Sequence, residues 1–179
     1  PCGAPGRVQT IRPNAPFRRS ISQNPAGTPS ANPAIARGCG TVVIACNTAS
    51  GAALTHLRET FPGVRFVGAE PAIKPAALHT RSGVIGVLAT HTTFAGARYA
   101  SLIEHYAAGA RVIEQPSPDW VTLVEAGPSF DAGAMRTIES RLRPLLDAGA
   151  DVLVLGCTHF PFLLPQIERV LSERAGIVR

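Results

Sequence analysis

Residues 34–179 alternate between short apolar runs and amphipathic stretches, which predicts strands and helices in turn. Runs rich in Val, Ile and Leu are typical of buried parallel strands. The predicted strands are residues 41–45, 64–67, 83–88, 111–113 and 151–155. The predicted helices are 49–60, 71–78 (a short helix or a hinge), 92–107, 120–126 (the start of a helix), 132–146 and 162–175, the last ending at Gly176. This order predicts an α/β fold with parallel sheets flanked by helices.

Residues 1–33 follow a different pattern. Seven prolines lie among Ser, Asn, Gly and Arg, and no period of 2 or 3.6 residues is present there. We therefore predict an irregular proline-rich segment, for which a frayed tail without a role is the simplest interpretation.

Two cysteines occupy matching places in the predicted fold. Cys46 closes the run 41–45, Cys157 follows the run 151–155, and small hydroxyl or amide residues come directly after each thiol. The repeated order of strand, Cys-containing turn and helix suggests an internal duplication of one α/β unit. Ligands of open parallel sheets bind beyond the carboxyl ends of the strands, where both thiols are expected.

Composition limits the classes of function. Hydrophobic residues make up 45% of the chain and charged residues 16%, which favours a globular core over disorder. The net charge of +5 comes from scattered arginines, without a basic helix face or interleaved aromatic residues, so nucleic-acid binding is not expected. No apolar run is long enough to span a membrane. The four cysteines include no Cys-x-x-Cys pair, so reduced thiols in a cytoplasmic protein are expected.

Each thiol has alternative interpretations when taken alone. A cysteine next to a buried strand is most often a small apolar core residue. At Cys46, however, Asn47, Thr48 and Ser50 add polar groups that a core would leave unsatisfied, and a helix N-terminus just after the thiol favours a thiolate or a bound carboxylate.

Cys157 has the same surroundings and also His159 two positions later. That histidine could face solvent, the pair could ligate a metal, or the imidazole could exchange a proton with the thiol. A zinc site needs three or four ligands, and no further Cys/His cluster accompanies the pair, so no metal and no cofactor are expected.

A pair of thiols suits the inversion of a carbon centre. One thiolate removes a proton from one face of the carbon, and the thiol on the other side delivers a proton to the opposite face. The reactive carbon would lie next to a carboxylate, for which Asn47, Thr48 and Thr158 offer donors near helix N-termini.

The motifs resemble those of the glutamate racemases, in the cofactor-independent aspartate/glutamate racemase superfamily. The segments Ala-Cys-Asn-Thr-Ala-Ser (45–50) and Gly-Cys-Thr-His-Phe-Pro (156–161) resemble the two signature motifs of that family. Three further segments between them also match: Glu-Pro-Ala-Ile-Lys-Pro-Ala (70–76), the strand and Thr-rich turn 83–93, and Leu-Val-Glu-Ala-Gly (123–127).

The resemblance implies two similar lobes with the active site between them. It divides the chain into the proline-rich segment 1–33, a partial first lobe 34–78 and a second lobe 79–179. The family's Asp-Ser-Gly turn does not occur in this chain, so an incomplete first lobe and a truncated racemase are expected.

The resemblance also implies roles for individual residues. Cys46 and Cys157 would be the acid/base pair, each serving one enantiomer, and His159 and Glu125 would assist Cys157. The substrate would be glutamate, converted between its L and D forms for peptidoglycan synthesis, and a homodimer would be compatible with the family. An impaired remnant, or a racemase for aspartate or a hydantoin, are the alternatives. The residues expected to contact the substrate or line its pocket are Asn47, Thr48, Thr90, Thr93, Thr158 and His159.

Overall fold

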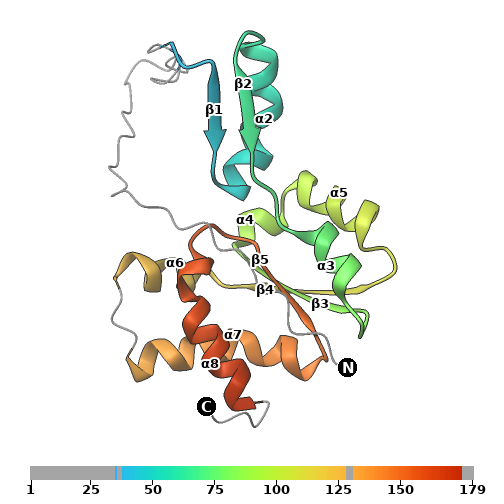
Figure 1. The fold of residues 1–179 in the computed structure, drawn as a ribbon, viewed down its shortest axis with the longest axis vertical. Coiled ribbons are helices and arrows are strands. Elements are labelled where there is room, and N and C mark those ends of the chain that lie inside the picture. Colours follow the sequence, from blue (N-terminus) through green and yellow to red (C-terminus); the bar gives the residue numbers. More distant parts are fainter. Residues whose placement is uncertain (1–34, 36–37, 128–130, 175–179) are drawn as a thin grey trace, which may run out of the picture.

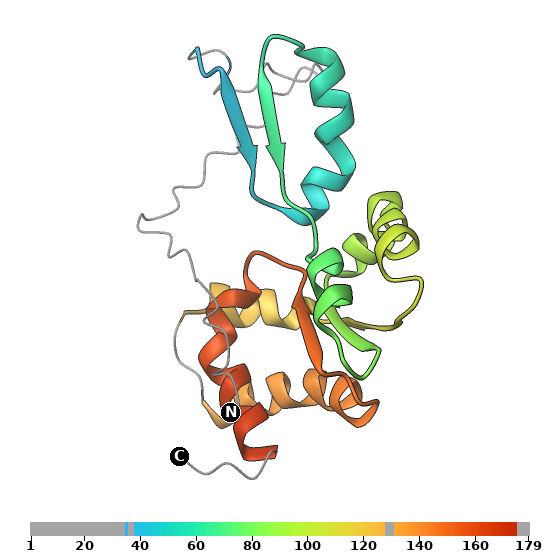
Figure 2. The ribbon, with the colours of Figure 1, turned by 45° about the vertical axis from the view of Figure 1, so that its right-hand side comes forward.

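Two parallel sheets organise the protein (Figure 1). The computed structural model describes residue 35 and residues 38–127 and 131–174. The first sheet pairs β1 (Thr41–Ile44) with β2 (Arg65–Gly68), and α2 (Asn47–Thr60) connects the two strands. The second sheet has the order β4-β3-β5 and carries all the later helices. Figure 2 shows the first sheet with α2 standing apart from the second, joined to it by the chain after β2.

Among the described residues, helix α2 covers one face of the first sheet, and no element covers the other. On the covered face lie Leu54 of α2 and Phe66 of β2, and both are at most 4% exposed. Val43 and Val67 lie opposite each other in the strand register, and they are 66% and 45% exposed. Side chains alternate between the faces of a strand, so the other face of this sheet is apolar and open.

The second sheet is buried on both faces. Its central strand β3 (Val84–Ala89) pairs in parallel with β4 (Arg111–Pro116) and β5 (Val152–Leu155). Ile85 and Val87 enter one core, whereas Leu88 enters the other. This strand is a continuous apolar run, as expected of a parallel strand with helices on both sides.

Each face of the second sheet has its own helices. On one face lie α3 (Ile73–His79), α4 (His91–Phe94) and α5 (Ala97–Tyr106), and their core includes Ile73 and Tyr99. The other face is covered by α6 (Pro118–Glu125), α7 (Ala132–Asp147), the 3-10 helix η1 (Phe160–Leu163) and α8 (Leu164–Arg174).

The α/β class with parallel sheets is confirmed, and all five predicted strands are present. The single helix predicted over 92–107 is wrong, because the chain leaves the helix between α4 and α5. Gly96 has extended dihedral angles there and caps α5, and glycine is a poor residue for a helix interior. The helix after Cys46 begins at Asn47, two residues earlier than predicted.

Other predictions concern the limits of the units. The irregular segment 1–33 and the helix end at Gly176 lie outside the described residues. The boundary between residues 78 and 79 stays a prediction. The helix α3 crosses that boundary at its last residue, His79, and its Ile73 and Ala76 are buried together with Ile85 of the second sheet. Within the described ranges, no helix has the length and apolarity needed to cross a membrane.

Candidate active site

Cys46 lies at the start of α2. The strand β1 ends at Ile44, and Cys46 has an extended backbone and is the N-cap residue of the helix. Its Sγ accepts a hydrogen bond from the Ala49 N–H at 3.5 Å, and its side chain is exposed. The thiol therefore faces solvent at the carboxyl end of a parallel strand, where the N-terminal end of a helix dipole favours negative charge.

Cys157 has an equivalent place after β5. The strand ends at Leu155, and Cys157 begins a turn closed by the Phe160 N–H, which donates to the Cys157 carbonyl at 3.1 Å. Burial raises the pKa of the half-buried Cys157 thiol, backbone N–H groups of the turn partly oppose this shift, and the nearby Cys46 sulfur adds to it. Cys157 therefore favours the protonated thiol, and its environment includes the sulfur of the other motif.

A direct hydrogen bond connects the two thiol-bearing turns. The Asn47 Nδ2 group donates to the Gly156 carbonyl oxygen at 2.7 Å. Asn47 follows Cys46, and Gly156 precedes Cys157, so this contact holds the backbones beside the two thiols together. Gly156 is buried, and a Cβ at this position would lie 2.9 Å from the Leu88 carbonyl oxygen.

Three threonine hydroxyls form a second connection between the sheets. The Oγ1 of Thr48 on α2 lies 2.9 Å from that of Thr93 and 3.4 Å from that of Thr90. Thr90 and Thr93 are themselves 3.1 Å apart, and both follow β3. The cluster places hydroxyl groups from both sheets on the side of the molecule where the strands end.

An acid–base pair accompanies Cys157. The His159 Nδ1 atom lies 3.7 Å from the Cys157 Sγ, and the His159 Nε2 atom lies 2.7 Å from Glu125 Oε1. The carboxylate can orient the imidazole, and the imidazole can exchange a proton with the thiol.

Packing beneath this pair fixes the elements that carry it. Trp120 of α6, the helix that ends in Glu125, makes an edge contact with Phe160 with ring centroids 5.1 Å apart. Both rings are fully buried. Arg141 of α7 pairs with Asp119 at 3.1 Å and holds the start of the same helix.

Most of the site residues expected from the sequence thus lie in two groups. One is formed by Asn47 and the three threonines between the sheets, and the other by Cys157 with its imidazole and carboxylate partners. Thr158 lies next to Cys157, and its side chain is exposed, as are those of Cys46 and Glu125. No cluster of three or more His, Cys, Asp or Glu side chains suited to a metal ion is present among the residues that the structure describes.

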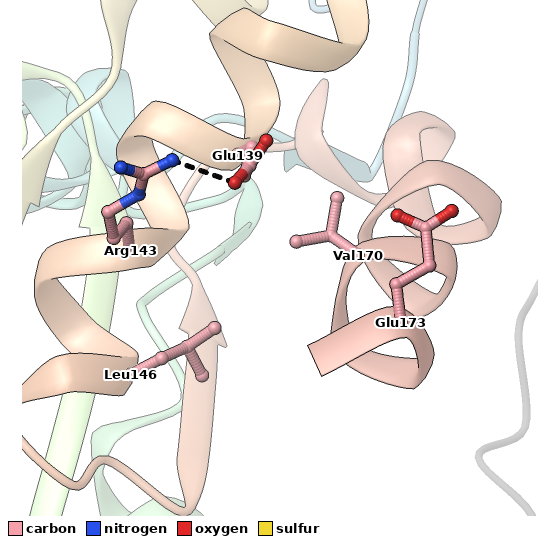
Figure 3. A pocket seen from close by; sticks show the side chains of 5 residues that line it. All are labelled: Glu139, Arg143, Leu146, Val170 and Glu173. Atoms are coloured by element: carbon pink, nitrogen blue, oxygen red, sulfur yellow. Dashed lines mark hydrogen bonds and ion pairs between the residues drawn. The ribbon is translucent and has the colours of Figure 1, made fainter. Parts of the chain in front are cut away.

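Two cavities are candidate sites: the first adjoins the thiol-bearing turns, and the second lies away from them. One of about 310 Å³ lies between α2, the segment after β2 and the α4–α5 turn, and Asn47, Thr48 and Thr93 contribute to its lining. A wider groove of about 490 Å³ separates α7 from α8 (Figure 3). Leu146, Val170 and Glu173 line that groove together with the ion pair of Glu139 and Arg143 at 2.8 Å, and none of these lining residues is a cysteine. The thiol-bearing turns are therefore the better candidate for chemistry.

The sequence model of the family described as Asp/Glu/Hydantoin racemase matches residues 14–177. The chain belongs to this family. Among curated members of the racemase family, the glutamate racemase of Roseiflexus sp. (strain RS-1) is 50% identical over 139 residues, which cover 78% of this chain and 51% of that protein. The glutamate racemase of Ectopseudomonas mendocina (strain ymp) is 44% identical over 144 residues, covering 80% and 55%.

Solved racemase structures have the same fold. The glutamate racemase of Escherichia coli, in complex with L-glutamate and the activator UDP-MurNAc-Ala, matches with a TM-score of 0.69 and 37% identity over 79% of this chain and 54% of that chain. The glutamate racemase of Francisella tularensis, in complex with D-glutamate, has a TM-score of 0.63 and 25% identity, covering 77% and 52%. The chain spans about half the length of the racemases it matches.

Two residues of the candidate site make contacts that the sequence did not indicate. Gly156 supplies the carbonyl that receives the Asn47 bond, and its only local signal is its place just before Cys157. Ser50 is buried and hydrogen-bonded to two backbone groups, whereas the sequence indicated only a polar residue near a thiol.

Proposed function

We propose that this chain is the two-thiol part of a glutamate racemase, which interconverts L- and D-glutamate without a cofactor. The hydrogen bond from Asn47 to Gly156 is the observation that carries the proposal. It supports an arrangement in which Cys46 and Cys157 approach one substrate from different sheets.

The proposed reaction moves one proton at each face of the α-carbon. The thiolate of one cysteine removes the α-proton and becomes a thiol. The thiol of the other cysteine then gives its proton to the opposite face and becomes the thiolate, so that charge and protons balance. The reverse reaction exchanges the two roles, and each cysteine therefore serves one enantiomer.

The proposed role of Cys157 is to begin as the proton donor in one direction. Burial favours its protonated form, and His159 lies within reach of its sulfur. Glu125 would hold the imidazole in place during proton exchange. In the opposite direction Cys157 must lose its proton, and the same imidazole would support that step.

The proposed substrate contacts come from both sheets. Asn47, Thr48 and Thr158 would offer donors to the carboxylates of glutamate, and Thr90 and Thr93 would line the pocket. These donors lie where strands of a parallel sheet end, which is the usual place for ligands.

Glutamate is favoured over other amino acids by the relatives. The family description covers aspartate, glutamate and hydantoin racemases, whereas the similar curated proteins are glutamate racemases. Supply of D-glutamate for peptidoglycan, in the cytoplasm, is the biological role that we propose.

One experiment tests the proposal. The purified full chain is incubated with L-glutamate in deuterated water, and proton NMR and chiral chromatography follow the α-position. Loss of the α-proton together with formation of D-glutamate is expected. Exchange with L-aspartate alone would assign the chain to another racemase of the family. No exchange by the folded protein would mean that this chain keeps the racemase fold without turnover.

A further inference from the structure

Ser50 is a buried hydroxyl at the base of the first thiol-bearing turn. Its side chain is 1% exposed. Its Oγ donates to the Ile44 carbonyl oxygen at 3.0 Å and accepts from the Ala69 N–H at 2.9 Å. One hydroxyl therefore joins the last residue of β1 to the first residue after β2.

These two backbone groups lead to different parts of the molecule. Ile44 lies two residues before Cys46, so its position determines where the thiol-bearing turn begins. Ala69 starts the segment that leaves the first sheet and reaches α3 on the second sheet, as Figure 2 shows. Through these two hydrogen bonds, Ser50 connects the end of β1, just before Cys46, to the segment that links the two sheets.

Close packing leaves little freedom around this hydroxyl. A Cβ added to Gly68 would lie 2.8 Å from a Leu54 methyl carbon and 3.0 Å from the Ser50 Oγ. Contacts this short require Leu54 or Ser50 to move, so the end of β2 packs closely against α2 at Ser50.

We propose that Ser50 is a positioning residue that sets the place of the Cys46 sulfur relative to Cys157. The proposal rests on the proposed function, since it assumes that the two thiols act on one substrate. Without the hydroxyl, the Ile44 carbonyl and the Ala69 N–H lose their shared partner. The first sheet then shifts relative to the connecting segment and carries Cys46 away from Cys157.

A buried hydroxyl elsewhere offers a matched control. Ser117 is fully buried, and its Oγ donates to the Gln115 carbonyl oxygen at 3.1 Å within the second sheet. Ser117→Ala and Ser50→Ala both remove a buried hydroxyl with a backbone partner, and each costs stability. Only Ser50→Ala is expected to alter the separation of the two thiols.

The test measures that separation without relying on turnover. Full-length variants carrying Cys2→Ser and Cys39→Ser are treated with dibromobimane, a short reagent that bridges two neighbouring thiols and becomes fluorescent when it does. Mass spectrometry verifies that the bridge joins Cys46 to Cys157. The expected result is a bridging yield at least threefold lower for Ser50→Ala than for Ser117→Ala, with single alkylation of each thiol retained. Ser50→Thr, which keeps the hydroxyl, should restore part of the yield.

Each outcome decides between the two proposals. Equal bridging in the Ser50→Ala and Ser117→Ala variants would overturn the role of Ser50 and leave the two-thiol site intact. No bridging in the protein with Ser50 present would overturn both. If Ser50→Ala does not fold, Gly68→Ala takes its place, because the added methyl displaces the hydroxyl without removing it, and the same threefold loss is expected.

Discussion

Asn47 and Gly156, 109 positions apart, are joined by a hydrogen bond of 2.7 Å from the side-chain amide to the carbonyl oxygen. Each residue is the immediate neighbour of a thiol. The bond therefore links the two thiol-bearing turns directly. This arrangement of the two turns is favoured, because the Gly156 carbonyl would lose its Asn47 partner in another arrangement and an unpaired buried carbonyl is unfavourable.

Replacing Asn47 by Ala should weaken this relation. The lost hydrogen bond is worth about 0.5–1.5 kcal/mol, and we expect racemisation to fall about tenfold, as a loss of about 1.4 kcal/mol in transition-state stabilisation would give. Chiral chromatography of glutamate measures the rate. Thr55→Ala, at an exposed position on the same helix, is the control and should keep the full rate. An Asn47→Ala variant as active as the unmodified chain would contradict the proposed role of the bond.

Removal of either proposed catalytic thiol should abolish racemisation. In Cys157→Ala one face of the α-carbon loses its proton carrier, and a general acid or base contributes about 10²–10⁴-fold to a rate. The exposed Cys39 supplies the control, since Cys39→Ser removes a thiol outside the proposed pair. Normal turnover by Cys157→Ala would show that the two-thiol assignment is wrong.

The pH dependence of alkylation should show the raised pKa of the half-buried Cys157 thiol. Burial and the neighbouring Cys46 sulfur raise the pKa of Cys157, so its thiolate forms at a higher pH than usual. Iodoacetamide reacts with the thiolate, and the reaction rate of Cys157 should therefore rise only on the alkaline side of the ordinary thiol range.

The variant Cys46→Ser tests the second cause of this shift. It removes the sulfur that disfavours the Cys157 thiolate, and the midpoint for Cys157 should move partly back to lower pH. Site-resolved mass spectrometry of the alkylated peptides follows the reaction. A Cys157 midpoint that is unchanged in Cys46→Ser would mean that the two sulfurs do not influence each other.

Glu125→Gln tests the imidazole partner of Cys157. The carboxylate accepts from the His159 ring at 2.7 Å, and an amide of the same size cannot stabilise a protonated ring in the same way. We expect kcat to fall severalfold with KM nearly constant, because this bond acts on proton transfer and solvent screens part of its strength at the exposed Glu125 carboxylate. Glu104→Gln, at an exposed position on α5, is the matched control. A rise in KM alone would assign Glu125 to substrate binding.

The strands and most of the helices could be predicted because their signals are local. β3 is an unbroken apolar run, and the periodicity of α7 places Ile138, Leu142 and Leu145 on one buried face. The break between α4 and α5 was missed, since a single Gly within an apolar periodic stretch does not by itself end a helix.

The relation between the two thiols was only partly accessible from the sequence. The repeated motifs around Cys46 and Cys157 suggested a shared site, because both follow predicted strands. The Asn47–Gly156 bond and the two hydrogen bonds of Ser50 have no such signal in the sequence. Each joins a side chain to a backbone group, and backbone groups are the same at every residue, so the sequence does not mark the partner. Tertiary structure is needed to find a carbonyl that accepts a bond from another sheet.

The last prediction concerns stability in acid. Asp151, at the start of β5, accepts hydrogen bonds from the Thr80 hydroxyl at 2.6 Å and from the backbone N–H groups of Arg81 and Ser82 at 2.7 and 2.9 Å. These bonds hold the pKa of the Asp151 carboxyl well below its usual range, with the Thr80 hydroxyl as the largest cause. The carboxylate therefore fastens the turn before β3 to the start of β5.

The sign of the pH dependence follows from this lowered pKa. The unfolded chain takes up a proton at Asp151 near the ordinary pKa of about 3.9, whereas the folded chain does so only at lower pH. The stabilisation is complete above that value and is lost as the pH falls below it. Asp151→Asn should be less stable than the unmodified chain at pH 7, and the gap should shrink between about pH 4 and pH 2. Urea unfolding at several pH values, followed by circular dichroism, measures both curves. Two curves that stay parallel throughout this range would mean that the Asp151 carboxylate does not hold the turn.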